Sequence, residues 1–370
     1  MTAPKHWEIF PLNVLVDVLD NLRVPVNSSE RSKRLGLVPY YGATGQVGTI
    51  DNAIFNEELL VLGEDGVQFF DQNKLKAYKI SGPAWVNNHA HVLRPKKDRV
   101  LQNFLLHFLN QFNYVGYANG TTRLKLTQGA MNSIPVPLPS IAEQQKIVEL
   151  LEDHLSRLDA ALADIKQAKI QAAQFRRSFI HDMTTAIEGS EVMGILDICD
   201  VYQPKTISTK ELISDGEFPV YGANGQIGFY DKFNHEESEV TVTCRGATCG
   251  TVNVIPAMSW ITGNAMVFRP KDSRIQKGFL EYVLRGMDWT PVITGTAQPQ
   301  ITRTSIQDVF VNVPSPDIQN DIYVKLESSL TQVTNASLLS VKVEMQAASL
   351  RRSLLQAAFT GQLTKEVVSV

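Results

Sequence analysis

The feature that most constrains this chain is an internal repeat. Residues 39–51 read PYYGATGQVGTID and residues 219–231 read PVYGANGQIGFYD, with eight of thirteen positions identical. Further matches follow at an offset of 175 residues, which pairs WVNNHAHVLRPK (85–96) with WITGNAMVFRPK (260–271). Because the offset falls from 180 to 175 between these segments, the second copy has lost five residues. Self-similarity of this extent predicts two tandem units, about 1–187 and 188–370.

Length and composition set the broad class. A chain of 370 residues that is 44% hydrophobic can bury two or three separate cores. No uncharged apolar run reaches the roughly 18 residues of a membrane span, and MTAPKHWEIF lacks the pattern of a secretion signal. We therefore expect a soluble, cytoplasmic protein with no membrane partner. The three cysteines are expected to be free thiols rather than disulfides or zinc ligands: Cys199, Cys244 and Cys249.

The first part of each unit has the pattern of a compact, strand-rich domain. Short β-branched runs such as EVTVTC and GTVNVI alternate with glycine and proline, which indicates short strands joined by turns. One helix is predicted at 99–113, with a counterpart at 274–287.

The second part of each unit has a heptad pattern. In the first unit it advances by alternating steps of four and three through Ile147, Leu151, His154, Leu158, Ala161, Ile165, Ala168, Ala172, Phe175 and Phe179. Adding 175 to each number gives Ile322, Leu326, Ser329, Val333, Ala336, Ser340, Val343, Ala347, Leu350 and Leu354. The two patterns predict long helices that pair as an antiparallel coiled coil. Ser140 is expected to cap the first helix, with Glu143 three residues later, and Ser315 or Asp317 the second.

The predicted fold class is therefore α+β, with two tandem mixed α/β domains separated by two long antiparallel coiled-coil helices and related by a pseudo-twofold repeat. We expect globular domains at 1–139 and 189–314, and helical regions at 140–188 and 315–370. A helix of roughly 40 residues is about 60 Å long, which would hold the domains at opposite ends. In the alternative arrangement, each helix packs only against its own domain. Helices that lie on a globular core usually show an apolar stripe with a period of 3.6 residues, so the heptads fit this alternative poorly.

The sequence contains no constellation that indicates catalysis. It lacks G-x-x-x-x-G-K-[ST], H-E-x-x-H, C-x-x-C and G-x-S-x-G, as well as the Asn/Asp-Pro-Pro-Tyr/Phe motif of amino methyltransferases. The repeated glycines are spaced by three, unlike a dinucleotide-binding loop, and are expected to supply positive φ in hairpin turns: Gly42, Gly45, Gly48, Gly222, Gly225 and Gly228. We predict that the chain is not an enzyme and has no cofactor or metal.

Several segments together resemble the specificity subunit of bacterial Type I restriction-modification systems. They are YGATGQVG, WVNNHAHVLRP and IPVPLPSIAEQQKIVELLE in the first unit, and YGANGQIG, TCRGATCGTVNV, SWITGNAMVFRP, GTAQPQIT and LRRSLLQAAFTGQLT in the second. The resemblance covers nearly the whole chain. It implies a non-catalytic subunit whose two target-recognition domains each bind half of a split double-stranded DNA site. It also implies that the paired helices set the spacing and dock two methyltransferase subunits, through which restriction subunits join.

The candidate DNA-binding residues lie in and near the repeated loops, where the copies differ in chemistry. Arg and Lys favour guanine at base edges whereas Gln favours adenine, so such differences could change the sequence that is bound. The candidates in the first unit are Tyr41, Thr44, Gln46, Lys76, Lys79, Thr121, Thr122, Arg123 and Lys125. Those in the second are Tyr221, Asn224, Gln226, Arg245, Thr248, Thr296, Gln298 and Gln300. Lys76 and Lys79 are taken as rough counterparts of Arg245 and Thr248. For each, a solvated or structural role is the alternative.

Four arginines near the helix ends are candidates for binding a partner subunit: Arg176, Arg177, Arg351 and Arg352. They could instead complement the helix dipole or contact phosphates. The first domain region (1–140) holds 14 basic and 11 acidic side chains and the second (188–315) holds 10 and 15, so much of the attraction for DNA would have to come from a partner. The alternative function is a structural adaptor whose repeated domains bind protein.

Overall fold

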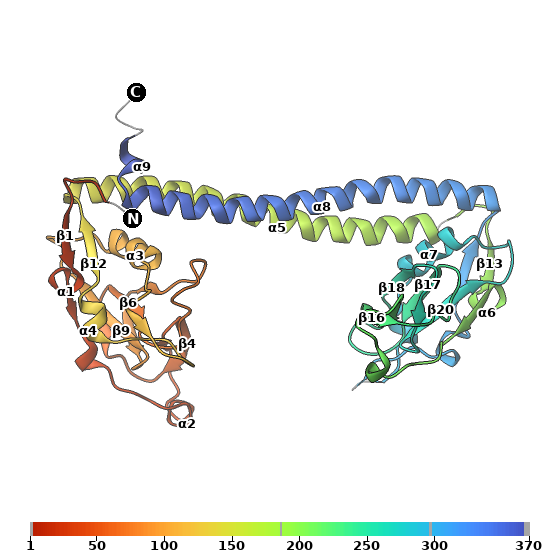
Figure 1. Cartoon of the computed structure of the whole chain (residues 1–370), viewed down its shortest axis with the longest axis horizontal. Helices are drawn as coiled ribbons and strands as arrows, with labels where there is room; N and C mark the ends of the chain where they lie inside the picture. The colour runs from red at the N-terminus through yellow and green to blue at the C-terminus, as the bar shows by residue number, and fades with distance from the viewer. Residues whose placement is uncertain (1–2, 186, 296–297, 366–370) are drawn as a thin grey trace. The chain divides into compact units, whose positions relative to one another are not determined.

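The computed structural model describes residues 3–185, 187–295 and 298–365 (Figure 1). It divides into two compact units, Met1–Asp164 with Lys342–Val370, and Ile165–Val341. Helix α5 (Ile141–Thr185) and helix α8 (Pro316–Phe359) each contribute residues to both units. Each unit therefore contains a globular domain, the start of one long helix and the end of the other.

The domain of unit 1 is built on two four-stranded sheets, in the orders β2-β9-β6-β7 and β4-β3-β8-β5. All neighbouring strands are antiparallel except β3 and β8. The strands are β1 (Glu8–Pro11), β2 (Val16–Val18), β3 (Val38–Gly42), β4 (Gly45–Ile50), β5 (Phe55–Asn56), β6 (Leu59–Gly63), β7 (Ala77–Ile80), β8 (Pro83–Val86), β9 (Ala90–Pro95), β10 (Ala118–Asn119), β11 (Lys125–Leu126) and β12 (Pro135–Leu138). The short helices are α1 (Leu12–Leu15), α2 (Ser28–Arg31), α3 (Gln102–Gln111), α4 (Gln128–Asn132) and, after α8, α9 (Gln362–Lys365).

The domain of unit 2 repeats this plan with sheets in the orders β14-β20-β17-β18 and β16-β15-β19. Its strands are β13 (Glu191–Gly194), β14 (Cys199–Tyr202), β15 (Phe218–Gly222), β16 (Gly225–Tyr230), β17 (Glu239–Thr243), β18 (Val252–Ile255), β19 (Trp260–Ile261), β20 (Ala265–Pro270) and β21 (Phe310–Val313). Its short helices are α6 (Ile195–Ile198) and α7 (Lys277–Gly286). The helices predicted at 99–113 and 274–287 are thus confirmed as α3 and α7.

Strand β6 shows why each domain is layered. All five of its residues are buried, and alternate side chains face opposite sides of the sheet. Leu60 and Leu62 join the core that contains Phe104 of α3. Leu59 and Val61 belong to a second core beside β8. The central strand therefore packs on both faces, which accounts for its unbroken apolar sequence.

A buried glutamine fixes the start of each long helix. Gln144 donates from Nε2 to the carbonyl oxygens of Arg99 and Pro139, and its Oε1 accepts from Leu101 N. Gln319 makes the same three bonds in unit 2, with Arg274, Pro314 and Gln276. The predicted cap is also present, since Glu143 N donates to Ser140 Oγ at 3.3 Å.

The heptad prediction is correct in kind, but four of its ten positions in α5 are exposed: His154, Ala161, Ala168 and Phe175. Leu155, the residue after His154, is buried instead. At this step the seam therefore runs one residue later, because burying the leucine is more favourable than burying the histidine. In α8 the predicted positions are shielded except Ala336 and Leu350, which are exposed.

The ends of the long helices complete the two cores. Phe359, near the end of α8, packs its ring against Phe104 and Phe108, with centroid distances of 5.3 and 5.6 Å. Ile180, near the end of α5, is buried in the core of unit 2, and the neighbouring His181 Nδ1 lies 3.0 Å from the carbonyl oxygen of Gly286. Each domain is thus closed by a helix that starts in the other half of the chain. The alternative in which each helix packs only on its own domain is therefore wrong.

The hairpin glycines were predicted correctly at four of six positions. Gly45 and Gly225 have φ of 137° and 106°, and Gly48 and Gly228 are also positive. Gly42 and Gly222 are not, and they are buried. The three cysteines are free thiols, as expected. Among the described residues, no helix is both long and apolar enough to cross a membrane.

The glutamine clamp can be tested with Gln144→Leu. The change removes three hydrogen bonds and leaves buried backbone groups unpaired, so the free energy of unfolding of unit 1 should fall by roughly 2–5 kcal/mol. Chemical denaturation would measure this. Gln145, the next residue, is exposed, and Gln145→Leu is the matched control that should change stability little. Equal effects of the two substitutions would contradict the clamp.

Candidate nucleic-acid interface

Three loops meet on one face of the unit 1 domain. The tip of the β3–β4 hairpin is held by Tyr78, whose hydroxyl donates to the carbonyl oxygen of Gly42 at 2.5 Å. The loop after β6 pairs with the β10–β11 hairpin through a bridge between Asp65 and Lys125 and a bond from Leu126 N to Glu64 O of 2.7 Å. The three segments come from distant parts of the sequence.

The unit 2 domain builds the same face. Thr243 Oγ1 donates to the carbonyl oxygen of Ala223 at 2.5 Å, which fixes the tip of the β15–β16 hairpin. Arg245 forms an antiparallel backbone β-bridge with Gln300, and Ile301 N donates to Cys244 O at 3.0 Å. The loop after β17 therefore lies between the two other loops.

Most of the predicted DNA-binding side chains lie on these faces and are exposed. In unit 1 these are Thr44, Gln46, Thr121, Thr122, Arg123 and Lys125, and in unit 2 Asn224, Gln226, Arg245, Thr248, Gln298 and Gln300. Tyr41 and Tyr221 are half-buried. Thr248 donates to the side-chain oxygen of Asn224 and links two of the loops. Thr296 lies outside the described residues.

Lys76 does not fit its predicted role. Only 2% of the residue is exposed, and its ammonium group donates to the carbonyl oxygens of Asp71 and Lys74 at 2.6 and 2.7 Å. Burial lowers the pKa of Lys76, and the nearby Asp71 opposes that shift. In this position the side chain holds the loop before β7 and cannot reach a base.

The predicted equivalence of Lys76 and Lys79 with Arg245 and Thr248 is also wrong. Lys79 pairs with Leu60 in the β6–β7 ladder, and the matching pair in unit 2 is Val254 with Val240. Lys79 is exposed and donates to Asn103 Oδ1 at 2.7 Å. Strand register makes Asp65, and not a lysine, the counterpart of Arg245 in the repeat. The five residues missing from the second copy belong to the loop that joins β6 to β7 in unit 1 and β17 to β18 in unit 2.

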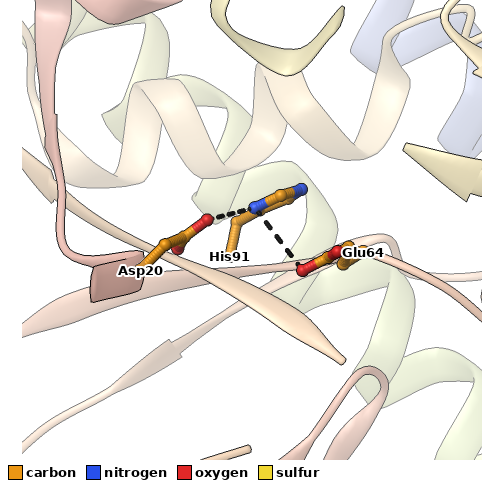
Figure 2. A group of neighbouring side chains, drawn as sticks. All are labelled: Asp20, Glu64 and His91. Carbon is orange, nitrogen blue, oxygen red and sulfur yellow. Dashed lines mark hydrogen bonds and ion pairs between the residues drawn. The ribbon is translucent and has the colours of Figure 1, made fainter. Parts of the chain in front are cut away.

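A charged cluster that the sequence did not reveal lies behind the unit 1 face (Figure 2). His91 of β9 places Nδ1 2.6 Å from Asp20 Oδ2 and 4.0 Å from Glu64 Oε2, while Nε2 lies 2.8 Å from the carbonyl oxygen of Leu126. Arg23 donates to Glu64 Oε2 at 2.8 Å. These residues follow no local motif, because the sheet brings together positions tens of residues apart.

The donor set of Asp20, Glu64 and His91 suits an ion-pair network better than a metal. Arg23 lies 2.8 Å from Glu64 and 3.3 Å from Asp20, so one cation already pairs with both carboxylates. Lys125 adds a second cation, 3.1 Å from Glu64 Oε1. The network supports the loops on which Arg23, Glu64 and Lys125 lie, since it ties three separate segments together.

The predicted partner-binding arginines have different surroundings. Arg176 and Arg177 are exposed and line an open groove of about 540 Å³ in unit 2, beside Trp289 and Ile293. Arg351 is already paired with Asp159 across the helix pair of unit 1. Arg352 is exposed.

Comparisons with known proteins agree with the sequence resemblance. The family described as Type I restriction modification DNA specificity domain matches residues 4–172 and 187–342. The chain is similar to S.HindORF215P of Haemophilus influenzae, described as a type I restriction enzyme specificity subunit, at 24% identity over 95% of this chain and 94% of that protein.

Two solved structures share the fold. One is a chain from a study of complex assembly and conformational transition in the type I R-M system, with a TM-score of 0.78, 16% identity, and coverage of 98% of this chain and 100% of that chain. The other is the HsdS subunit from Thermoanaerobacter tengcongensis, with a TM-score of 0.58, 15% identity and 98% coverage of both chains.

The ion-pair network predicts a pH dependence. Burial, the largest influence, raises the pKa of Glu64, but hydrogen bonds from Arg23 and Lys125 together with nearby positive charge leave that pKa below its ordinary value of 4.5. The contribution of Glu64 to stability is therefore present above pH 4.5 and lost as the pH falls through the lowered pKa.

The test compares the wild-type chain with Glu64→Gln by urea denaturation at pH values from about 7 to 3. The wild type should be the more stable at pH 7, and the difference should shrink below about pH 4.5. Glu58→Gln is the matched control, because Glu58 is an exposed carboxylate directly before the same strand β6. A difference that does not change with pH would contradict the role of the Glu64 charge.

Proposed function

Because the chain belongs to the Type I restriction modification DNA specificity family, we propose that each unit binds one half of a bipartite double-stranded DNA site. The observation that carries this proposal is the three-loop face, which is built twice on the same backbone plan but with different exposed side chains. Base edges are contacted by side chains that a rigid scaffold positions. Two domains with the same backbone plan and different loop side chains therefore suit the recognition of two different base sequences.

The side chains on the two faces differ in the base edges they favour. Unit 1 presents Arg123 and Lys125, whose donors suit the O6 and N7 acceptors of guanine. At the same positions unit 2 presents Gln298 and Gln300, which suit adenine. The other exposed candidates on these faces are proposed to contact DNA as well, but Lys76 is not, because its ammonium group is buried.

The chain is proposed to act without catalysis or a cofactor of its own. Two methyltransferase subunits bind it and modify the DNA, and restriction subunits join through them. These partners supply much of the phosphate attraction, because the chain carries a formal net charge of −3. The two long helices, each shared by both units, set the separation of the half-sites.

Surface features of unit 2 support a docking role for the helices. Leu338 and Leu339 of α8 are 66% and 61% exposed, which is unusual for neighbouring leucines of a protein that acts alone. The groove beside Arg176 and Arg177 combines exposed cations with apolar side chains, a surface that suits an acidic segment of a methyltransferase subunit.

The proposed function predicts that cells carrying this chain and its methyltransferase partner have methylation at one bipartite motif. Methylome sequencing would show the motif, and footprinting of the assembled complex should show two short protected tracts with an unprotected gap. The chain alone should neither bind S-adenosylmethionine nor methylate DNA. An assembly without sequence preference would favour the adaptor alternative instead.

The docking proposal predicts that Arg176→Glu combined with Arg177→Glu weakens methyltransferase binding, because it reverses the charge beside the groove. Co-purification and titration would detect a loss of roughly tenfold or more in affinity. Lys166→Glu on the same helix is the matched control, since Lys166 is exposed and lies outside the lining of the groove. Equal effects of both charge reversals would argue against this groove.

A further inference from the structure

The two recognition faces carry opposite charge at one structurally equivalent position. The backbone of Asp65 forms a β-bridge with Lys125 in unit 1. At the same place in unit 2, the backbone of Arg245 forms a β-bridge with Gln300. The preceding residues, Glu64 and Cys244, each accept a backbone bond from the hairpin strand. The equivalence therefore rests on hydrogen bonding and not on sequence identity.

In unit 1 this position anchors a cation. Arg123 Nη2 lies 2.5 Å from Asp65 Oδ1, and His89 Nδ1 lies 3.0 Å from the same carboxylate. A Cβ added at Gly66 would lie 2.9 Å from Arg123 Nη2, so the guanidinium rests directly over this glycine. The Arg123 side chain is 59% exposed, and its ion pair with Asp65 brings the guanidinium over the loop after β6.

In unit 2 the position itself carries the cation. Arg245 is exposed and makes no side-chain hydrogen bond or ion pair with any residue that the structure describes. It lines a pocket of about 290 Å³ together with Gln203, Gln300 and Arg303. The strand register makes Met266 the counterpart of His91. Continuing the β2–β9 and β14–β20 ladders past their last printed pairs makes Gln203 the counterpart of Asp20. Neutral side chains therefore replace the charged network of unit 1.

We infer that this position determines the specificity of both half-sites, by a different route in each. This inference rests on the proposed function. Arg245 contacts a guanine directly in the half-site of unit 2, because its guanidinium forms no ion pair with a carboxylate of the described residues and is available to DNA. Asp65 is a positioning residue in unit 1, where it fixes the guanidinium of Arg123 above the loop for contact with a base.

The experiment uses the complete complex with its methyltransferase subunits and a DNA library in which both half-sites are randomised. Methylation rates are measured for the wild type, Arg245→Gln, Arg245→Lys, Asp65→Asn and Arg123→Gln. A bipartite preference of the wild type establishes the proposed function independently. Its absence would overturn that function, whatever the variants do.

Arg245→Gln should lose roughly 5- to 150-fold of the preference for one guanine, all within one half-site, and Arg245→Lys should lose a smaller part of the same preference. The lysine variant keeps the charge but loses the bidentate geometry, and so tests the inference even if the glutamine variant fails to assemble. Asp65→Asn should relax one position in the other half-site, by less than Arg123→Gln does.

Three results would overturn the inference. An equal fall in rate on all sequences, with the salt dependence reduced, would make Arg245 a phosphate contact. An unchanged preference would remove it from recognition altogether. If Asp65→Asn lowered the rates uniformly without changing the preferred sequence, Asp65 would have only a structural role.

Discussion

Each globular core in this chain depends on apolar side chains from a helix that begins in the other half of the sequence. Phe359 fills the core of unit 1, and Ile180 fills that of unit 2. Removing a large buried side chain from such a core lowers the free energy of unfolding by several kcal/mol. The core of unit 1 is therefore incomplete without the end of α8, and that of unit 2 without the end of α5. Each long helix is consequently part of both cores, with the residues near its start in one and those near its end in the other.

The repeat preserves hydrogen bonds more faithfully than it preserves residues. Gln144 and Gln319 make the same three bonds, and Tyr114 and Trp289 both donate to a carbonyl oxygen five residues earlier in the chain. These contacts fix the backbone, and a buried polar group left unpaired is costly. The exposed loop residues carry no such penalty, which leaves the two faces free to differ where a ligand would be contacted.

The sequence predicted the repeat, a strand-rich plan for each domain, the helices α3 and α7 and the paired long helices, because each has a strong periodic or self-similar signal. It did not predict the helix register fully, since Leu155 and His154 are neighbours and only packing decides between them. The Asp20–Glu64–His91 network was missed because its members meet only through sheet pairing. Lys76 was misassigned because the sequence does not show that the loop before β7 encloses its ammonium group.

The same limit explains why Asp65 was not among the predicted site residues. An alignment based on identity breaks in the loop that lost five residues, so the counterpart of Arg245 could be assigned only roughly by position. Backbone pairing continues through the break and shows an aspartate at that position. A change from carboxylate to guanidinium there alters the local field by two charges beside a surface that would face phosphates, where effects of charge are large. One loop position can thus alter binding more than many conservative changes elsewhere on the face.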